Sequence, residues 1–306
     1  MTAEAPEGYA LRIGGVQVGV APSSPRLRLS PAPSARRFVV NAGVADSSLA
    51  AAWRELDPEP PGDLVFDSHG SWRLYRRDGL DLYRFFDGTI GPLPYKELEL
   101  DPGGRSGRIW LDPRYHDTEE PLDPLQFPLD ELLFLRLLSE RDAVELHACA
   151  LVTPSGRGVV FSGQSGDGKS TTARLWSTVD GASVLSDDRV VVRREADGLW
   201  AYGTPWHGDA GIARSARAPL AAVLVLGRGE RDEIRPLGRA EALSLLVARS
   251  FPPFHDGAAM SRTLATLESV VASMPCARFD FVPGPGAVRS ILEWLPAGAG
   301  APAAVR

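Results

Sequence analysis

The chain of 306 residues lacks several features that mark particular classes of protein. It has only two cysteines, Cys149 and Cys276, so at most one disulfide can form and we expect a reduced, cytoplasmic setting. The formal net charge of −6 provides no basic surplus for a nucleic-acid partner. The longest apolar run, near residues 218–226, is too short to cross a bilayer, and residues 1–15 carry no targeting signal that we recognise. We therefore expect neither a nucleic-acid nor a membrane partner.

Lysine is also scarce. Of the 33 basic residues only Lys96 and Lys169 are lysines, so the rest are arginines. A lysine at a motif position in this chain is therefore unlikely to occur there by chance. The composition, 44% hydrophobic and 24% charged, is otherwise that of a foldable protein with one large or two modest domains.

The first part of the chain predicts an antiparallel β-rich domain. Alternating strand patterns are separated by turn residues at 68–70, 78–79 and 102–104. A passage rich in proline and acidic residues, 117–128, then precedes a helix signal that starts at Asp130. We therefore expect a boundary near residue 125, with a smaller β-rich domain over 1–125 and a second domain over 126–306.

The second part mixes strand and helix patterns. Short apolar runs predict strands within 144–154, 156–163, 183–206, 221–227 and 277–284. Helical spacing predicts helices over 170–179, 239–250, 261–273 and 287–295. The fold class is therefore α/β or mixed α+β. The Ala- and Pro-rich tail, 296–305, is expected to be frayed.

A complete phosphate-binding signature, G-x-x-x-x-G-K-[ST], lies between an apolar strand and a helix, the context that this motif requires. Its glycines let backbone N–H groups turn toward an anion, and the helix N-terminus adds partial positive charge. Lys169 is expected on the β- and γ-phosphates and Ser170 on Mg²⁺. The alternative is a glycine-rich turn without a ligand. The expected nucleotide-binding residues are Gly163, Gln164, Ser165, Gly166, Asp167, Gly168, Lys169, Ser170 and Thr171.

Paired aspartates follow the phosphate loop. Adjacent strand residues point to opposite faces, so one of Asp187 and Asp188 can hold Mg²⁺ while the other accepts a proton from a hydroxyl. The alternative is an exposed Asp-Asp turn.

His147 precedes the loop and shares a strand face with Glu145 and Cys149. If its strand lies beside the loop strand, His147 ends near the phosphates and assists there. The alternatives are an ordinary core histidine and, more weakly, a metal site with its two neighbours. Further on, 202–209 carries Trp206 and His207, which could cover the substrate or the adenine or only close a hairpin.

The order of His147, phosphate loop and Asp187-Asp188-Arg189 resembles the HPr kinase/phosphorylase family and its relatives, which include kinases acting on a serine of lasso peptides. The more distant ATP-dependent phosphoenolpyruvate carboxykinases share that order. The resemblance covers about residues 125–215. It implies a carboxykinase-like P-loop fold, with Asp187 as general base and Asp188 nearer the metal. The glycine-rich segment that the bifunctional HPr enzymes carry after the aspartates is missing, which argues against HPr as substrate.

The sequence thus predicts an ATP- and Mg²⁺-dependent kinase that phosphorylates a hydroxyl of a peptide, a protein or a small metabolite. The catalytic residues would be Asp187, His147 and Lys169, and the metal ligands Ser170 and Asp188. The alternative is a nucleotide-binding regulatory or scaffold protein without phosphoryl transfer. The acceptor, the reverse phosphorolysis, self-association and the role of the N-terminal domain stay open at this point.

Overall fold

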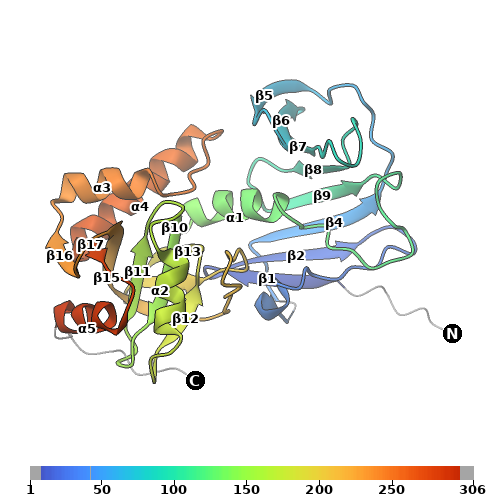
Figure 1. The fold of residues 1–306 in the computed structure, drawn as a ribbon. Coiled ribbons are helices and arrows are strands. Elements are labelled where there is room, and N and C mark those ends of the chain that lie inside the picture. The colour runs from blue at the N-terminus through green and yellow to red at the C-terminus, as the bar shows by residue number, and fades with distance from the viewer. Residues whose placement is uncertain (1–7, 42, 297–306) are drawn as a thin grey trace. The chain divides into compact units, whose positions relative to one another are not determined.

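The computed structural model describes residues 8–41 and 43–296. The expected tail, 296–305, falls almost wholly outside these residues. So do residues 1–7, the beginning of the segment that carries no recognised targeting signal. The chain divides into two compact units, the N-terminal unit over 1–137 and the C-terminal unit over 138–306. Together they contain helices and two mixed sheets, which confirms the mixed α and β class (Figure 1). None of the described helices has both the length and the apolar character to cross a membrane.

The described part of the N-terminal unit forms a nine-stranded sheet in the order β3-β1-β2-β4-β9-β8-β7-β6-β5. The expected turns at 68–70, 78–79 and 102–104 join the hairpins β5–β6, β6–β7 and β8–β9. The expectation of a purely antiparallel sheet is wrong, because β4 pairs in parallel with both β2 and β9. Its strands are β1 (Tyr9–Ile13), β2 (Val16–Pro22), β3 (Val39–Val40), β4 (Ser47–Trp53), β5 (Asp63–Asp67), β6 (Trp72–Arg77), β7 (Leu80–Phe85), β8 (Lys96–Leu100) and β9 (Ser106–Leu111), and a 3₁₀ turn covers Arg36–Phe38.

The division between the units falls inside α1 (Leu129–Ser139), after the boundary expected near residue 125. Leucines of this helix lie against β7 and β8, where Leu129 and Leu133 share a small cavity with Phe85 and Leu98. In addition, Arg136 is paired with Asp81 of β7 at 2.9 Å. Most of the helix therefore belongs to the N-terminal sheet by its packing.

The C-terminal unit contains one eight-stranded sheet, in which each of two long strands pairs with different strands along its length. The first half of β10 pairs with β13, and its second half pairs with β11 and β12. Likewise β15 pairs with β14 at its start and with β11 and β17 beyond it. The strands are β10 (Ala143–Val152), β11 (Gly158–Ser162), β12 (Ser183–Ser186), β13 (Arg189–Glu195), β14 (Gly198–Gly203), β15 (Arg217–Arg228), β16 (Glu233–Pro236) and β17 (Cys276–Phe281). All but β16 fall within the predicted strand regions or extend them by a few residues.

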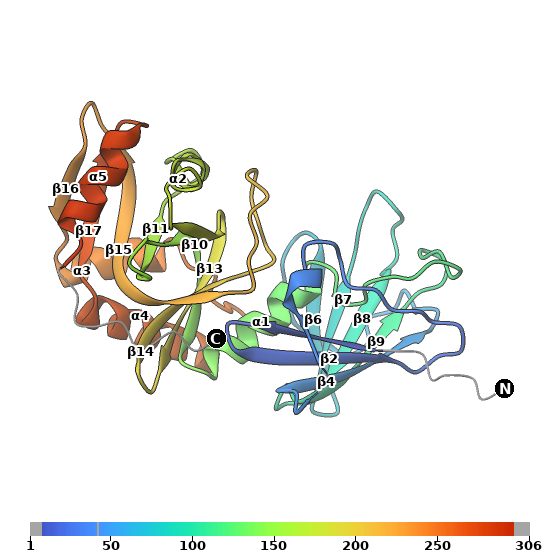
Figure 2. The same cartoon turned by 90° about the horizontal axis from the view of Figure 1, so that it is seen from below.

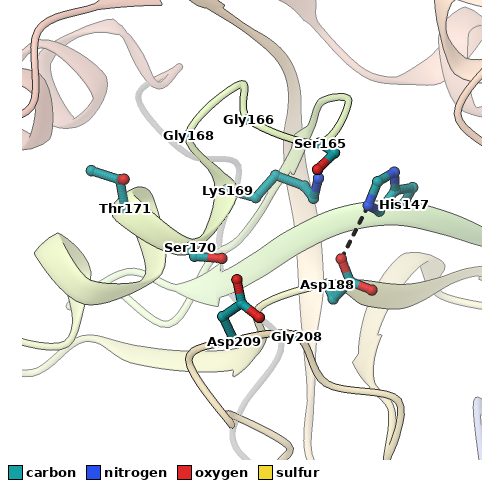
Figure 3. Close-up of a pocket in the computed structure, with 10 residues that line it drawn as sticks. All are labelled: His147, Ser165, Gly166, Gly168, Lys169, Ser170, Thr171, Asp188, Gly208 and Asp209. Atoms are coloured by element: carbon teal, nitrogen blue, oxygen red, sulfur yellow. Dashed lines mark hydrogen bonds and ion pairs between the residues drawn. The ribbon is translucent and has the colours of Figure 1, made fainter.

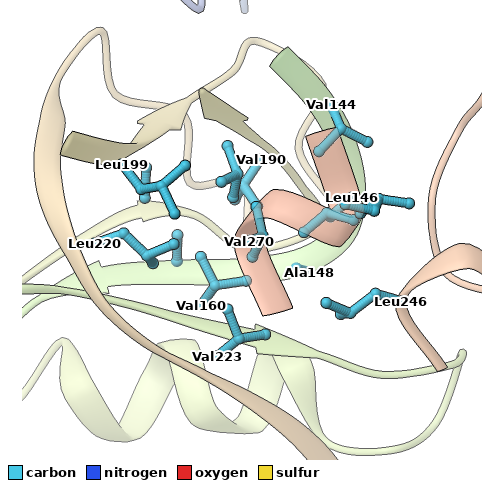
Figure 4. Packing of buried hydrophobic residues seen from close by; sticks show 14 of the residues in the cluster. Val144, Leu146, Ala148, Val160, Val190, Leu199, Leu220, Val223, Leu246 and Val270 are labelled. Atoms are coloured by element: carbon cyan, nitrogen blue, oxygen red, sulfur yellow. The ribbon is translucent and has the colours of Figure 1, made fainter. Parts of the chain in front are cut away.

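Helices cover both faces of the sheet that contains β11, β15 and β17. Figure 2 shows α2 (Lys169–Trp176) and α5 (Pro285–Trp294) toward one side, and α3 (Arg239–Val247) and α4 (Gly257–Ser273) toward the other. Even-numbered residues of β10, such as Leu146 and Ala148, pack with Val270 of α4 (Figure 4). Odd-numbered ones, Cys149 and Leu151, pack with α2 and α5. This alternation places His147 on the α2 side.

Strands β11, β15 and β17 run parallel to one another. Their carboxyl ends therefore meet at one edge of the sheet, which is the usual place for a ligand in open α/β sheets. The segment 163–170 follows β11 at this edge and leads into α2.

Candidate functional site

The phosphate loop, 163–170, has the backbone that its glycines permit. Gly166 and Gly168 have φ angles of 86° and 106°, in the region that favours glycine. At Gly168 two features disfavour a side chain, the positive φ angle and the ring of Phe281, which would lie 2.8 Å from an added Cβ. Gly168 precedes α2, so the first N–H groups of that helix are left without helical partners and can meet an anion.

Side chains hold this loop in place. The Lys169 ammonium donates to the carbonyls of Gly163 and Gln164 at 3.0 and 3.1 Å, and burial lowers its pKa. Asp167 accepts from the Gln164 N–H at 2.6 Å, and Arg228, at the end of β15, donates to the Gly166 carbonyl at 2.9 Å. We did not predict Arg228, because its position beside the loop comes from the parallel pairing of β11 with β15.

Beside the loop lies a cavity of about 400 Å³ (Figure 3). Its lining combines loop residues with acidic and imidazole side chains from three other places in the chain. These residues are His147, Ser165, Gly166, Gly168, Lys169, Ser170, Thr171, Asp188, Gly208 and Asp209. The structure thus brings together His147, most of the loop and one of the two aspartates, whereas Gly163, Gln164 and Asp167 shape the loop from outside the cavity.

His147 and Asp188 form a pair in this cavity. The Nε2 atom of His147 lies 3.0 Å from Oδ1 of Asp188 (Figure 3). This hydrogen bond is the main cause that lowers the pKa of Asp188, and the charges of Lys169 and Arg189 act in the same direction. The carboxylate is thereby kept ionised and aimed at the space beside the loop.

The surroundings of His147 fix its ring. Its backbone N–H donates to the carbonyl of Arg249 at 2.8 Å, and the Phe251 ring meets the imidazole edge-on at 6.0 Å between centroids. The Arg189 guanidinium lies 4.5 Å from the centroid of the same aromatic ring and 3.6 Å from Asp188. Phe251 was not predicted, because nothing near it in the sequence shows that it lies beside His147.

Asp187 is placed differently from its neighbour. It is fully buried, does not line the cavity, and accepts from the backbone N–H groups of Gly208, Ala210 and Ile212 at 3.1, 2.8 and 3.2 Å. The geometry therefore argues against the base role that we expected for Asp187. The two aspartates do have separate surroundings, but the one facing the cavity is Asp188.

The segment 205–212 contributes two residues to the cavity, Gly208 and Asp209. Trp206 and His207, which could cover a ligand or only close a hairpin, are not among the lining residues. The sequence assigns no role to Asp209, although this residue lies in the segment 202–209. Its place in the cavity follows from the anchoring of the segment by Asp187, which no local pattern reveals.

The donor set of the cavity suits a hard cation that binds together with phosphate. Ser170, Asp188 and Asp209 offer oxygen ligands, the kind that Mg²⁺ prefers. Across residues 8–41 and 43–296, no three His, Cys, Asp or Glu side chains are arranged to hold a metal by themselves. Mg²⁺ normally takes only one or two carboxylates and completes its shell with phosphate and water. The weaker interpretation of Glu145, His147 and Cys149 as a metal site thus has no support in this part of the chain.

In comparisons with known proteins, neither a protein-family model nor a curated protein matches the chain.

Proposed function

We propose that the chain is an ATP- and Mg²⁺-dependent kinase that transfers the γ-phosphoryl group to a hydroxyl. The observation that carries the proposal is the ionised Asp188, paired with His147 in the cavity that the phosphate loop lines. A loop that only retained nucleotide would need no such pair at this place. By resemblance the C-terminal unit would be a carboxykinase-like P-loop domain, and the acceptor a peptide, a protein or a small metabolite.

Nucleotide binding would rest on the loop and the start of α2. The free N–H groups there and the Lys169 ammonium suit the β- and γ-phosphates. In the structure Lys169 donates to two loop carbonyls, so a phosphate would replace these acceptors without unfolding the loop. Ser170, with a carboxylate of the cavity, would hold the Mg²⁺, which supplies neutralisation of phosphate charge when bound.

Phosphoryl transfer would then need few further groups. The acceptor oxygen forms a bond to the γ-phosphorus while the bond from that phosphorus to the bridging oxygen breaks, and ADP leaves. The hydroxyl proton passes to Asp188, the carboxylate that faces the cavity. His147 holds that carboxylate in place through its 3.0 Å hydrogen bond. The role of base, expected for Asp187, is thereby proposed for Asp188.

Calorimetry with Mg-ATP tests the binding step. Lys169→Ala should lose measurable affinity, because it removes the charge on the β- and γ-phosphates. Lys96→Ala is the matched control, since the other lysine is buried in the N-terminal unit, where it donates to the carbonyls of Pro124 and Gln126. Full affinity in Lys169→Ala would overturn the nucleotide site.

Consumption of ATP labelled in the γ-phosphate tests the transfer step, with peptide, sugar and other hydroxyl compounds offered as acceptors. The wild type should transfer label, and Asp188→Asn should bind Mg-ATP but transfer at least about 10²-fold more slowly. If the wild type binds Mg-ATP and transfers label to no hydroxyl, the regulatory alternative replaces the kinase.

A further inference from the structure

The buried Asp187 organises the segment that carries Asp209. Its two carboxylate oxygens accept three backbone N–H bonds, from residues 208, 210 and 212. A second anchor follows directly, where the N–H of Arg214 donates to the carbonyl of Leu185 at 2.9 Å. The segment is thus attached to the end of β12 at several points, and Asp209 lies between two of the anchored N–H groups.

Gly208 explains how closely the segment approaches. A Cβ at this position would lie 3.1 Å from Oδ2 of Asp187 and 3.1 Å from Cβ of Asp188. The backbone therefore packs against both aspartates, and the next residue, Asp209, reaches the cavity. Figure 3 draws its carboxylate on the Ser170 side, whereas Asp188 lies on the His147 side.

We propose that Asp209 is the carboxylate that, with Ser170, holds the Mg²⁺ of bound Mg-ATP, and that Asp187 is its positioning residue. This inference rests on the proposed function. It gives each acidic group a separate role, in which Asp188 would receive the proton and Asp209 would face the metal. Asp187 would shape the segment that carries Asp209.

The surroundings of the two cavity carboxylates favour this division. Asp188 is engaged on both oxygens, by His147 at 3.0 Å and by Arg189 at 3.6 Å. The hydrogen bond on one oxygen and the positive charge of Arg189 beside the other make this carboxylate a less favourable ligand for a further cation. The Asp209 carboxylate makes no hydrogen bond or ion pair with the residues that the structure describes, and it lines the same cavity as the Ser170 hydroxyl. Asp209 can therefore take a metal without losing another contact.

The experiment measures how much Mg²⁺ tightens nucleotide binding. Calorimetry with a non-hydrolysable ATP analogue gives one dissociation constant in EDTA and another in excess Mg²⁺. The Mg²⁺ ratio is the constant in EDTA divided by the constant in Mg²⁺. Asp209→Asn should lower this ratio by about tenfold or more, because mutation of even an outer-shell partner typically lowers the affinity for a metal by about 10- to 100-fold. Asp180→Asn, an exposed residue of the same unit, is the control for the change in charge and should leave the ratio unchanged.

An unchanged ratio in Asp209→Asn would overturn the inference and leave a solvated surface carboxylate, while the proposed kinase would stand. Absence of nucleotide binding by the wild type would instead overturn the proposed function and this inference with it. The two failures are therefore distinguishable in one set of titrations.

The positioning role of Asp187 has its own test. Asp187→Asn should lower the Mg²⁺ ratio in the wild-type background but have no further effect when Asp209→Asn is already present. An equal effect in both backgrounds would show that Asp187 does not act through Asp209. If Asp187→Asn does not fold, Gly208→Ala serves in its place, because its added Cβ displaces the same segment without removing an acceptor.

Discussion

Replacing each of the paired aspartates by asparagine should separate fold stability from turnover. In Asp187→Asn, one amide oxygen can still accept from Gly208 and Ile212, which both donate to Oδ1 in the wild type. The amide nitrogen then takes the place of Oδ2 and faces the N–H of Ala210 donor to donor. A hydrogen bond to a charged group contributes about 1.5–3 kcal/mol, and this contribution is lost for the Ala210 bond. The two remaining hydrogen bonds are weakened, because their acceptor is then neutral. We expect a loss of about 2–4 kcal/mol in the free energy of unfolding.

Asp188→Asn should behave in the opposite way. Its partner His147 is partly exposed, and exposed ion pairs contribute only about 0–1 kcal/mol. The stability loss should therefore be about 1 kcal/mol or less, while turnover collapses. Urea unfolding followed by tryptophan fluorescence measures both variants, because Trp176 is buried in the C-terminal unit. The interpretation is refuted if Asp188→Asn is the more destabilising change, or if Asp187→Asn leaves stability unaltered. Asp180→Asn again controls for charge.

Two further predictions concern the His147–Asp188 pair. His147→Ala should lower turnover about tenfold or more with little effect on the melting temperature, because the imidazole is partly exposed and orients a carboxylate; a large stability loss with normal turnover would restore a core role. The lowered pKa of Asp188 means that the folded state binds its proton less readily than the unfolded state, so its contribution to stability is present above the unfolded pKa. The difference in unfolding free energy between wild type and Asp188→Asn should therefore shrink as the pH falls below about 4. Urea titrations over a pH series measure this difference. A difference that grows at low pH would contradict the assigned pair.

Local signals were sufficient for most elements of the C-terminal unit. The apolar run before the loop, the glycines of the loop and the helical spacing after it are contiguous in the sequence, and the structure contains β11, the loop and α2 in that order. The side of β10 on which His147 lies also follows from strand alternation. These features depend on neighbours within a few residues, which a sequence shows directly.

Alternation was less useful for the aspartate pair. β12 ends at Ser186, and residues 187–188 form a bend before β13 begins. Strand alternation predicts side-chain directions only inside a regular strand, so it cannot say which aspartate faces the cavity. The placement of Arg228, Phe251 and Asp209 depends on chain segments far from the loop in sequence. The parallel pairings of β4 arise in the same way, from long connections that return the chain to the sheet.

The topology of β10 explains why His147 meets Asp188. β12 and β13 are consecutive in the chain, yet they pair with different halves of β10: Ser186 lies opposite Ala150 and Arg189 opposite His147. Residues 187–188 must therefore run alongside β10 between these positions, and the N–H of Ala148 indeed donates to the carbonyl of Asp188 at 2.8 Å. β11 pairs with the same half of β10 as β12, so the phosphate loop starts close to residues 187–188. Because backbone pairing places Asp188, its replacement by asparagine should leave the side chain at the same position and change only its charge.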